Sequence, residues 1–171
     1  MKRHHIDIGV VLAVGGLLAG CGSDDTNSDN AVADGEVEYV DVETFASEAG
    51  YVFNYETDDA TGECVLSNAG VTCLGTAAGD ISDVEIPPME PARPNAVFVG
   101  QEGVDYVLFE ESPGAEGTLE AGQRLTLSGT TCTAVDDTTL ECTNDDAGFT
   151  ISGSDQMIET TTEPLGTYFV E

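Results

Sequence analysis

From residue 51 to the C-terminus, apolar and β-branched residues fall into short runs, separated by Gly, Asp, Asn and Ser clusters. These turn clusters recur about every 8–12 residues, as is typical of all-β domains. Within 123–127, Leu125 and Leu127 alternate with polar residues and so share one face of a strand. The pattern predicts an all-β fold, a small antiparallel sandwich or barrel made of hairpins. The predicted strands include 51–55, 64–66, 71–74, 96–99, 104–109, 123–127, 148–152 and 168–170.

Only one segment has the period of a helix. Apolar residues between Val42 and Ala49 fall on one helical face, Asp41 can cap the N-terminus, and Gly50 suits the stop. We therefore expect one short N-terminal helix over 41–50. The segment 86–94 holds four prolines and is expected to be an extended connection rather than a strand inside a sheet.

The first 20 residues have the features of an export signal. Lys2 and Arg3 precede an apolar stretch at 8–18 that is too short to span a bilayer. It ends in Leu-Ala-Gly-Cys21, which resembles the lipoprotein box of bacteria, in which the cysteine is lipidated and becomes residue one. We expect a signal peptide at 1–20, a palmitate-type lipid anchor on Cys21, and a flexible acidic tether at 21–35. The alternatives are a secretory signal without lipidation or a membrane anchor that is kept.

The four remaining cysteines stand in two predicted hairpins, Cys64 with Cys73 and Cys132 with Cys142. An even number of cysteines in an exported chain indicates disulfides. Directly opposite residues of a hairpin bring their Cβ atoms to about 4.5–5.5 Å. We therefore predict the pairs Cys64–Cys73 and Cys132–Cys142 among the three possible pairings. Their C-x8-C and C-x9-C spacings argue against a zinc site and against a C-x-x-C redox pair.

Charge excludes several partners. The chain has 33 acids and 4 bases, and loss of the signal peptide removes Lys2, Arg3 and Asp7, which leaves 32 acids against Arg93 and Arg124. A net charge near −30 opposes binding of nucleic acid or anionic lipid head groups, which requires cations. A solvated acidic surface is the simplest explanation; attraction of cations or basic partners is the more specific one.

A family resemblance rests on Phe53, the segments 62–64 and 70–73, the Pro87-Pro88 step, and later glycines and cysteines. The later part comprises 119–123, Cys132, 140–142 and Gly148-Phe149. Together these resemble small secreted proteins and lipoproteins of actinobacteria, mycobacterial ones included, that are catalogued as domains of unknown function. The resemblance spans 51–152 and implies no activity.

The sequence offers little catalytic chemistry. After Cys21 it holds no His and no Lys, so it cannot form a Ser-His-Asp or Ser-Lys site or supply His ligands to a metal. Carboxylates gather in three loops, and oxygen ligands of this kind suit Ca²⁺, although none matches a twelve-residue calcium loop. Turn formation explains the same residues without a metal. The weak candidates are Asp58, Asp59, Asp136, Asp137, Asp145 and Asp146.

We therefore expect a single disulfide-stapled β domain at 36–171, held by its lipid anchor on the extracytoplasmic face of the cell membrane. The expected role is a non-enzymatic binding or accessory module, a monomer that recognises an envelope protein or polymer and no nucleic acid. The alternative is a cation-binding or carboxylate-dependent hydrolase domain.

Overall fold

The computed structural model describes residues 37–79, 81–88, 90–109 and 114–170. The predicted signal peptide at 1–20, the lipidated Cys21 and the tether at 21–35 lie outside these residues. The described chain is mostly β-strand, with a single 3₁₀ turn as its helical content, which confirms the all-β class. It forms two open sheets of mixed strand direction, and neither closes on itself.

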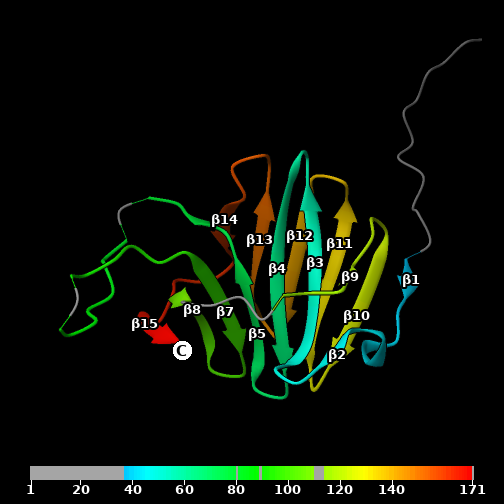
Figure 1. Ribbon diagram of the computed structural model, residues 1–171, viewed down its shortest axis with the longest axis horizontal. Coiled ribbons are helices and arrows are strands. Elements are labelled where there is room, and N and C mark those ends of the chain that lie inside the picture. Colours follow the sequence, from blue (N-terminus) through cyan, green and yellow to red (C-terminus); the bar gives the residue numbers. More distant parts are fainter. Residues whose placement is uncertain (1–36, 80, 89, 110–113, 171) are drawn as a thin grey trace, which may run out of the picture. The chain divides into compact units, whose positions relative to one another are not determined.

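The strands of the two sheets come largely from two successive parts of the chain (Figure 1). Sheet A has the order β1 (Glu38–Tyr39), β10 (Gln123–Leu127), β11 (Thr130–Asp136), β12 (Thr139–Asn144), β13 (Ala147–Ser152), β14 (Met157–Thr160), β6 (Thr76–Ala77). Sheet B has the order β15 (Thr167–Val170), β8 (Gly103–Phe109), β7 (Ala96–Gly100), β5 (Gly70–Leu74), β4 (Ala60–Ser67), β3 (Gly50–Thr57), β2 (Ala46–Ser47). The short β9 (Gly117–Thr118) pairs with β3 beside this path.

Each half of the chain lends strands to the sheet of the other half. The antiparallel run β3-β4-β5-β7-β8 comes from the first half, and the run β10-β11-β12-β13-β14 comes from the second. Before each run, a short strand crosses over and pairs in parallel with the first strand of the other run: β1 with β10, and β9 with β3. Likewise β6 joins β14 and β15 joins β8, both in parallel. The two halves therefore depend on each other.

One hydrophobic core receives side chains from both sheets. Buried side chains of sheet B pack in the same cluster as those of sheet A, and removal of this apolar surface from water stabilises the fold by about 25 cal/mol per Å². The largest fully buried side chains are Tyr55, Phe53, Phe149, Leu66, Leu119, Leu125, Leu140, Ile151 and Ile158.

Both predicted disulfides are present. Cys64 lies directly opposite Cys73, and Cys132 directly opposite Cys142, with Cα–Cα distances of 4.1 Å in both pairs. All four cysteines are fully buried and belong to the core cluster. The bridges therefore stiffen each hairpin from its core-facing side.

The prediction of a helix over 41–50 is wrong in its extent and type. Val42–Phe45 forms a single 3₁₀ turn, and the Asp41 carboxylate accepts a hydrogen bond from the Glu43 N–H at 3.0 Å, so only the predicted cap is correct. The chain then becomes extended because Ala46 and Ser47 pair with Tyr51 and Gly50 of β3. Pairing along an open sheet edge thus overrides a weak helical pattern.

The proline-rich segment runs outside both sheets, as expected. Between β6 and β7 the described residues contain only an isolated bridge, in which Val84 and Ala92 exchange backbone hydrogen bonds at 2.8 and 3.1 Å. Figure 1 shows this green segment extending beyond the strands. Among the described residues, no helical segment has the length and apolar character that a membrane crossing requires.

Candidate functional site

Two of the three acidic loops meet at one end of the strands. Asp58 and Asp59 form the turn between β3 and β4, and Asp136 and Asp137 open the turn between β11 and β12. The Asp58 N–H donates to the Asp137 carbonyl at 2.7 Å, so the two turns touch. Asp145 and Asp146 occupy the turn at the opposite end of β12 and are not part of this contact.

Local turn structure accounts for several residues of these loops. Asp136 accepts hydrogen bonds from the Thr138 N–H at 2.9 Å and the Thr138 hydroxyl at 2.7 Å, and these bonds lower the pKa of its carboxyl. Asp58 and Asp145 have positive φ angles of 54° and 50°, which Asp tolerates better than most residues. Among the described residues, no three His, Cys, Asp or Glu side chains are placed to hold a metal ion. Calcium binding at these loops stays a prediction.

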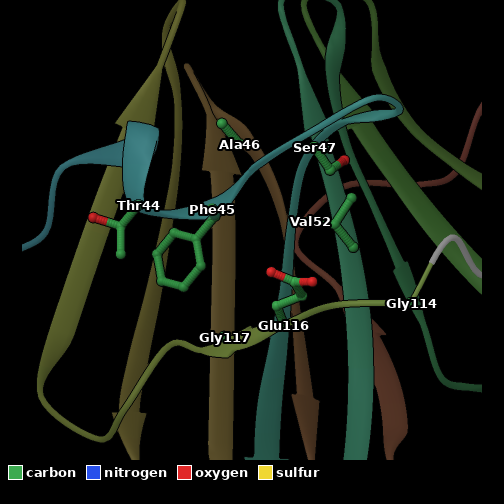
Figure 2. Close-up of a pocket in the computed structure, with 8 residues that line it drawn as sticks. All are labelled: Thr44, Phe45, Ala46, Ser47, Val52, Gly114, Glu116 and Gly117. Atoms are coloured by element: carbon green, nitrogen blue, oxygen red, sulfur yellow. The ribbon is translucent and has the colours of Figure 1, made fainter.

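A first hollow lies at the outer edge of β3, where β2 and β9 pair with successive parts of the same strand. It has a volume of about 210 Å³. In the view of Figure 2, the Glu116 side chain lies between Phe45 and Val52, and Ser47 lies above Val52. The Ser47 hydroxyl is engaged locally, since it accepts from Ala49 N–H and donates to the Gly50 carbonyl, both at 3.1 Å. The apolar lining residues Phe45 and Val52 are buried, so a ligand would meet mainly polar side chains in this hollow, among them Thr44 and Glu116.

Glu63 supports the segment that borders this hollow. The residue lies on β4 on the face away from the core, yet only 8% of it is exposed. Its carboxylate accepts a hydrogen bond from the Ala115 N–H at 2.7 Å. This charge-assisted bond fixes the approach to β9 against the sheet. The role of Glu63 is therefore to hold the backbone at Ala115 in place.

A second hollow, of about 440 Å³, lies on the outer face of sheet B where β7, β8 and β15 are neighbours. We call it the aromatic–acidic hollow. It combines two aromatic rings, two carboxylates and two side-chain amides. The lining residues are Asn68, Ala69, Phe98, Gln101, Glu102, Gly103, Asp105 and Tyr168.

Strand pairing explains how these residues meet. Val97 and Val99 point into the core, so Phe98 between them points outwards. Phe98 lies directly opposite Asp105 on β8. The parallel strand β15 then places Tyr168 next to Val107, so its ring reaches Phe98 with centroids 6.4 Å apart and an interplanar angle of 70°.

The ring of Phe98 lies against two glycines of the sheet. A Cβ at Gly70 or Gly100 would come within 2.8 or 2.7 Å of the Phe98 ring, and closer still to the backbone carbonyls of Val99 or Ala69. These two glycines therefore leave space for the aromatic ring on the sheet surface. Phe98 is partly exposed and Tyr168 is 38% exposed, so both rings border solvent.

The hollow is electrostatically unbalanced. Burial raises the pKa of the Asp105 carboxyl, the nearby Glu102 raises it further, and a hydrogen bond from the Gly166 N–H opposes both effects. Burial also raises the pKa of the Tyr168 hydroxyl, and the charge of Asp105 adds to this rise. The partly buried negative charge of Asp105 is therefore costly in the unliganded protein.

The sequence did not identify this hollow. The run 96–99 predicted a strand, but in an apolar run no alternation shows that Phe98 faces outwards while its neighbours face the core. Tyr168 and Asp105 are 63 positions apart and meet only because β15 adds to β8. The tight glycines at 70 and 100 were the one local signal that a ring could lie on the sheet.

Comparison with protein-family models, with curated proteins and with solved structures gives no match. The function is therefore argued from the geometry of this chain.

Proposed function

We propose that the chain is a lipid-anchored, extracytoplasmic and non-enzymatic binding module, whose ligand occupies the aromatic–acidic hollow. The observation that carries the proposal is the exposed pair of rings, Phe98 and Tyr168, beside the partly buried Asp105. Exposed aromatic residues and convergent polar groups in a concave surface are the usual features of a binding site.

Compartment and architecture support this role. Two disulfides suit an oxidising compartment outside the cytoplasm. The N-terminal pattern around Cys21 supports export and lipidation, and the likeness to actinobacterial secreted proteins and lipoproteins is in line with it. Two open sheets over one core favour a sandwich rather than a barrel. We propose a monomer, because the edges of both sheets are formed by the short strands β1, β6, β15 and β2, which offer little backbone for pairing with a second copy.

The anchor can be tested by metabolic labelling with a palmitate analogue. We expect label on the wild-type protein and its recovery in the membrane fraction, whereas Cys21→Ala should carry no label and leave that fraction. Equal membrane recovery of Cys21→Ala would contradict the anchor.

The binding role can be tested with the full chain anchored in vesicles of neutral lipid. After incubation with envelope extract, flotation should recover a specific envelope component. Tyr168→Leu should lose that component because it removes one ring of the hollow, while Glu159→Gln on the other sheet should retain it. Failure to recover any component, or equal recovery by Tyr168→Leu, would contradict binding at this hollow.

A carboxylate-dependent hydrolase is the second candidate, because Glu102 lies in the same hollow as Asp105, whose pKa is raised. Glycoside hydrolysis needs one protonated and one ionised carboxyl group. Release of reducing ends from envelope polysaccharide, abolished by both Asp105→Asn and Glu102→Gln, would establish this reaction. If the wild type releases no more reducing ends than the Asp105→Asn/Glu102→Gln double variant, hydrolysis of that substrate is excluded.

A further inference from the structure

The aromatic–acidic hollow carries negative charge that no described cation balances. Lys2 and Arg3 lie outside the described residues, and the chain has no Lys or Arg besides these and Arg93 and Arg124. Arg93 donates to the carbonyls of Ala77 at 3.0 Å and Gly79 at 2.6 Å.

Arg124 is also engaged elsewhere. It donates to the Thr133 hydroxyl at 2.8 Å and lies over the ring of Tyr39, with 5.8 Å between its Cζ and the ring centroid. Thr133 belongs to sheet A, whereas the hollow lies on sheet B. Both arginines therefore have partners away from Asp105 and Glu102.

The walls of the hollow suit a cation that has an apolar part. The rings of Phe98 and Tyr168 offer π faces, which attract ammonium and guanidinium groups. Leu165, which is 65% exposed, packs near Gly103, one of the residues that line the hollow. A bare metal ion would leave this aromatic and aliphatic surface unused, and an anion would meet two carboxylates.

Resting on the proposed binding function, we infer that the aromatic–acidic hollow binds an organic cation, an alkylammonium or guanidinium group. Its charged end pairs with the Asp105 carboxylate, and its aliphatic stem lies against Phe98 and Tyr168. Such a group can belong to a free diamine or to a lysine or arginine side chain of a protein partner. A cation in this place relieves the cost of the partly buried Asp105 charge.

The other half of the chain supplies a matched control. In sheet B, Phe98 is opposite Asp105, one rung from the Cys64–Cys73 bridge. At the equivalent rung of sheet A, Thr150 is opposite Glu159, one rung from Cys132–Cys142. Glu159→Gln thus removes one carboxylate at the same register, but beside a threonine rather than an aromatic ring.

The test is a titration of the full chain, ¹⁵N-labelled and held in a neutral maltoside detergent at near-physiological salt. The probes are cadaverine, Nα-acetyl-lysine methylamide and the uncharged Nα-acetyl-norleucine methylamide. The backbone amides of Gly103 and Gly166, which adjoin the hollow, report binding. Salt screens the overall acidic field beyond about 8 Å, so a local site is distinguishable from general attraction.

We expect saturable shifts with both amines and none with the norleucine derivative. Asp105→Asn should weaken the binding of both amines about tenfold, and Tyr168→Leu about fivefold, in line with the strength of carboxylate and cation–π contacts. Glu159→Gln should stay within about twofold of wild type. Tighter binding of cadaverine than of the lysine derivative indicates a free diamine as ligand. The reverse order indicates a side chain of a protein partner. If Tyr168→Leu does not fold, Glu102→Gln serves as the second variant.

Two results would overturn the inference. One is that the norleucine derivative binds as tightly as the lysine derivative. The other is that Glu159→Gln weakens amine binding as much as Asp105→Asn does. The flotation experiment separates this failure from failure of the proposed function. An envelope component that Tyr168→Leu loses and Asp105→Asn retains would leave the binding module standing and exclude its cationic ligand.

Discussion

The two halves of the chain place a disulfide at the same point of the same framework. In each five-stranded antiparallel run, the bridge joins the second and third strands, β4–β5 in one and β11–β12 in the other. One rung away, the outward-facing residues differ. In sheet B the row is Val52, Val65, Thr72, Phe98 and Asp105, and in sheet A it is Arg124, Thr133, Glu141, Thr150 and Glu159.

This difference separates the features that the two halves share from those of the proposed binding site. A row of mixed polar and charged residues on an exposed sheet face needs no ligand to explain it. A row that is mostly apolar and ends in a partly exposed aromatic ring and a partly buried carboxylate has the features expected of the proposed binding site. The added strands strengthen the contrast, since β15 brings Tyr168 to β8, whereas β6 brings only Thr76 and Ala77 to β14.

Inside the core the halves also reach stability by different means. Two residues before the first cysteine, the first half has Gly62, whose missing side chain leaves room for the ring of the opposite Tyr55. The second half has Thr130, whose hydroxyl accepts a hydrogen bond from the buried Asn144 amide at 2.8 Å. One hairpin is filled by an aromatic ring and the other by a polar pair.

The largest expected effect is loss of a bridge. Closing loops with sequence separations of 9 and 10 stabilises the fold by about 2.7 kcal/mol each in the chain-entropy model. We expect Cys64→Ala/Cys73→Ala and Cys132→Ala/Cys142→Ala each to lower the free energy of unfolding by about 3 kcal/mol, measured by urea titration. Costs that differ by more than about 2 kcal/mol would show that the two halves do not share one framework.

Gly62→Ala should have the next largest effect. The new Cβ would overlap the Tyr55 ring, which is fully buried and cannot move outwards. We expect a loss of about 2–3 kcal/mol, the usual cost of overpacking a rigid core. Thermal unfolding measures it, and the Gly62→Ala/Tyr55→Leu double variant should recover part of the loss. Gly62→Ala with wild-type stability would refute this packing.

Thr130→Val should cost about 1–2 kcal/mol, because it leaves the buried Asn144 amide without its partner. Replacing both residues, as Thr130→Val/Asn144→Leu, should cost less than the sum of the single changes. A double-mutant cycle measured by urea unfolding gives the coupling directly. Strict additivity would mean that this polar pair does not stabilise the second half.

The stability that Tyr55 adds to the first half should depend on pH, and Tyr55→Phe tests this. The Tyr55 hydroxyl donates to the Leu74 carbonyl, so its loss should cost about 1 kcal/mol near neutral pH. Burial raises the pKa of this hydroxyl far above the ordinary value of 10. The wild type should therefore keep this stability below about pH 10 and lose it as the pH rises further. The difference between wild type and Tyr55→Phe should shrink at alkaline pH; Thr130→Val offers a control without such a trend.

Local patterns in the sequence were enough to predict the strand runs and both disulfides. The hairpin turns within 64–74 and 132–142 placed the bridges, because each cysteine pair lies within one hairpin. The sequence could not predict the crossing strands β1, β6 and β9, since two residues carry no periodic signal. The helix over 41–50 failed for a local reason: the chain turns back at 48–49, so that Ala46 and Ser47 pair with Tyr51 and Gly50. The aromatic–acidic hollow, in contrast, depends on the long-range pairing of β15 with β8.

The smallest effect concerns the extra residue of the second hairpin. Both hairpins have two-residue turns, Asn68-Ala69 and Asp137-Thr138, yet the second cysteine spacing is longer by one. The pairing of β11 with β12 shifts between Ala134 and Asp136, so Val135 is the bulged residue, and it is 49% exposed. Deletion of Val135 should restore an even ladder with the same Cys132–Cys142 register. We expect the free energy of unfolding, measured by thermal unfolding, to fall by less than about 1 kcal/mol, mainly because the hydrogen bond from Asp58 N–H to the Asp137 carbonyl is disturbed. Deletion of Ala69 is the control: the first hairpin has no bulge to absorb the change, so that variant should be far less stable. Equal costs for the two deletions would show that Val135 fixes the register of the second half rather than being surplus to it.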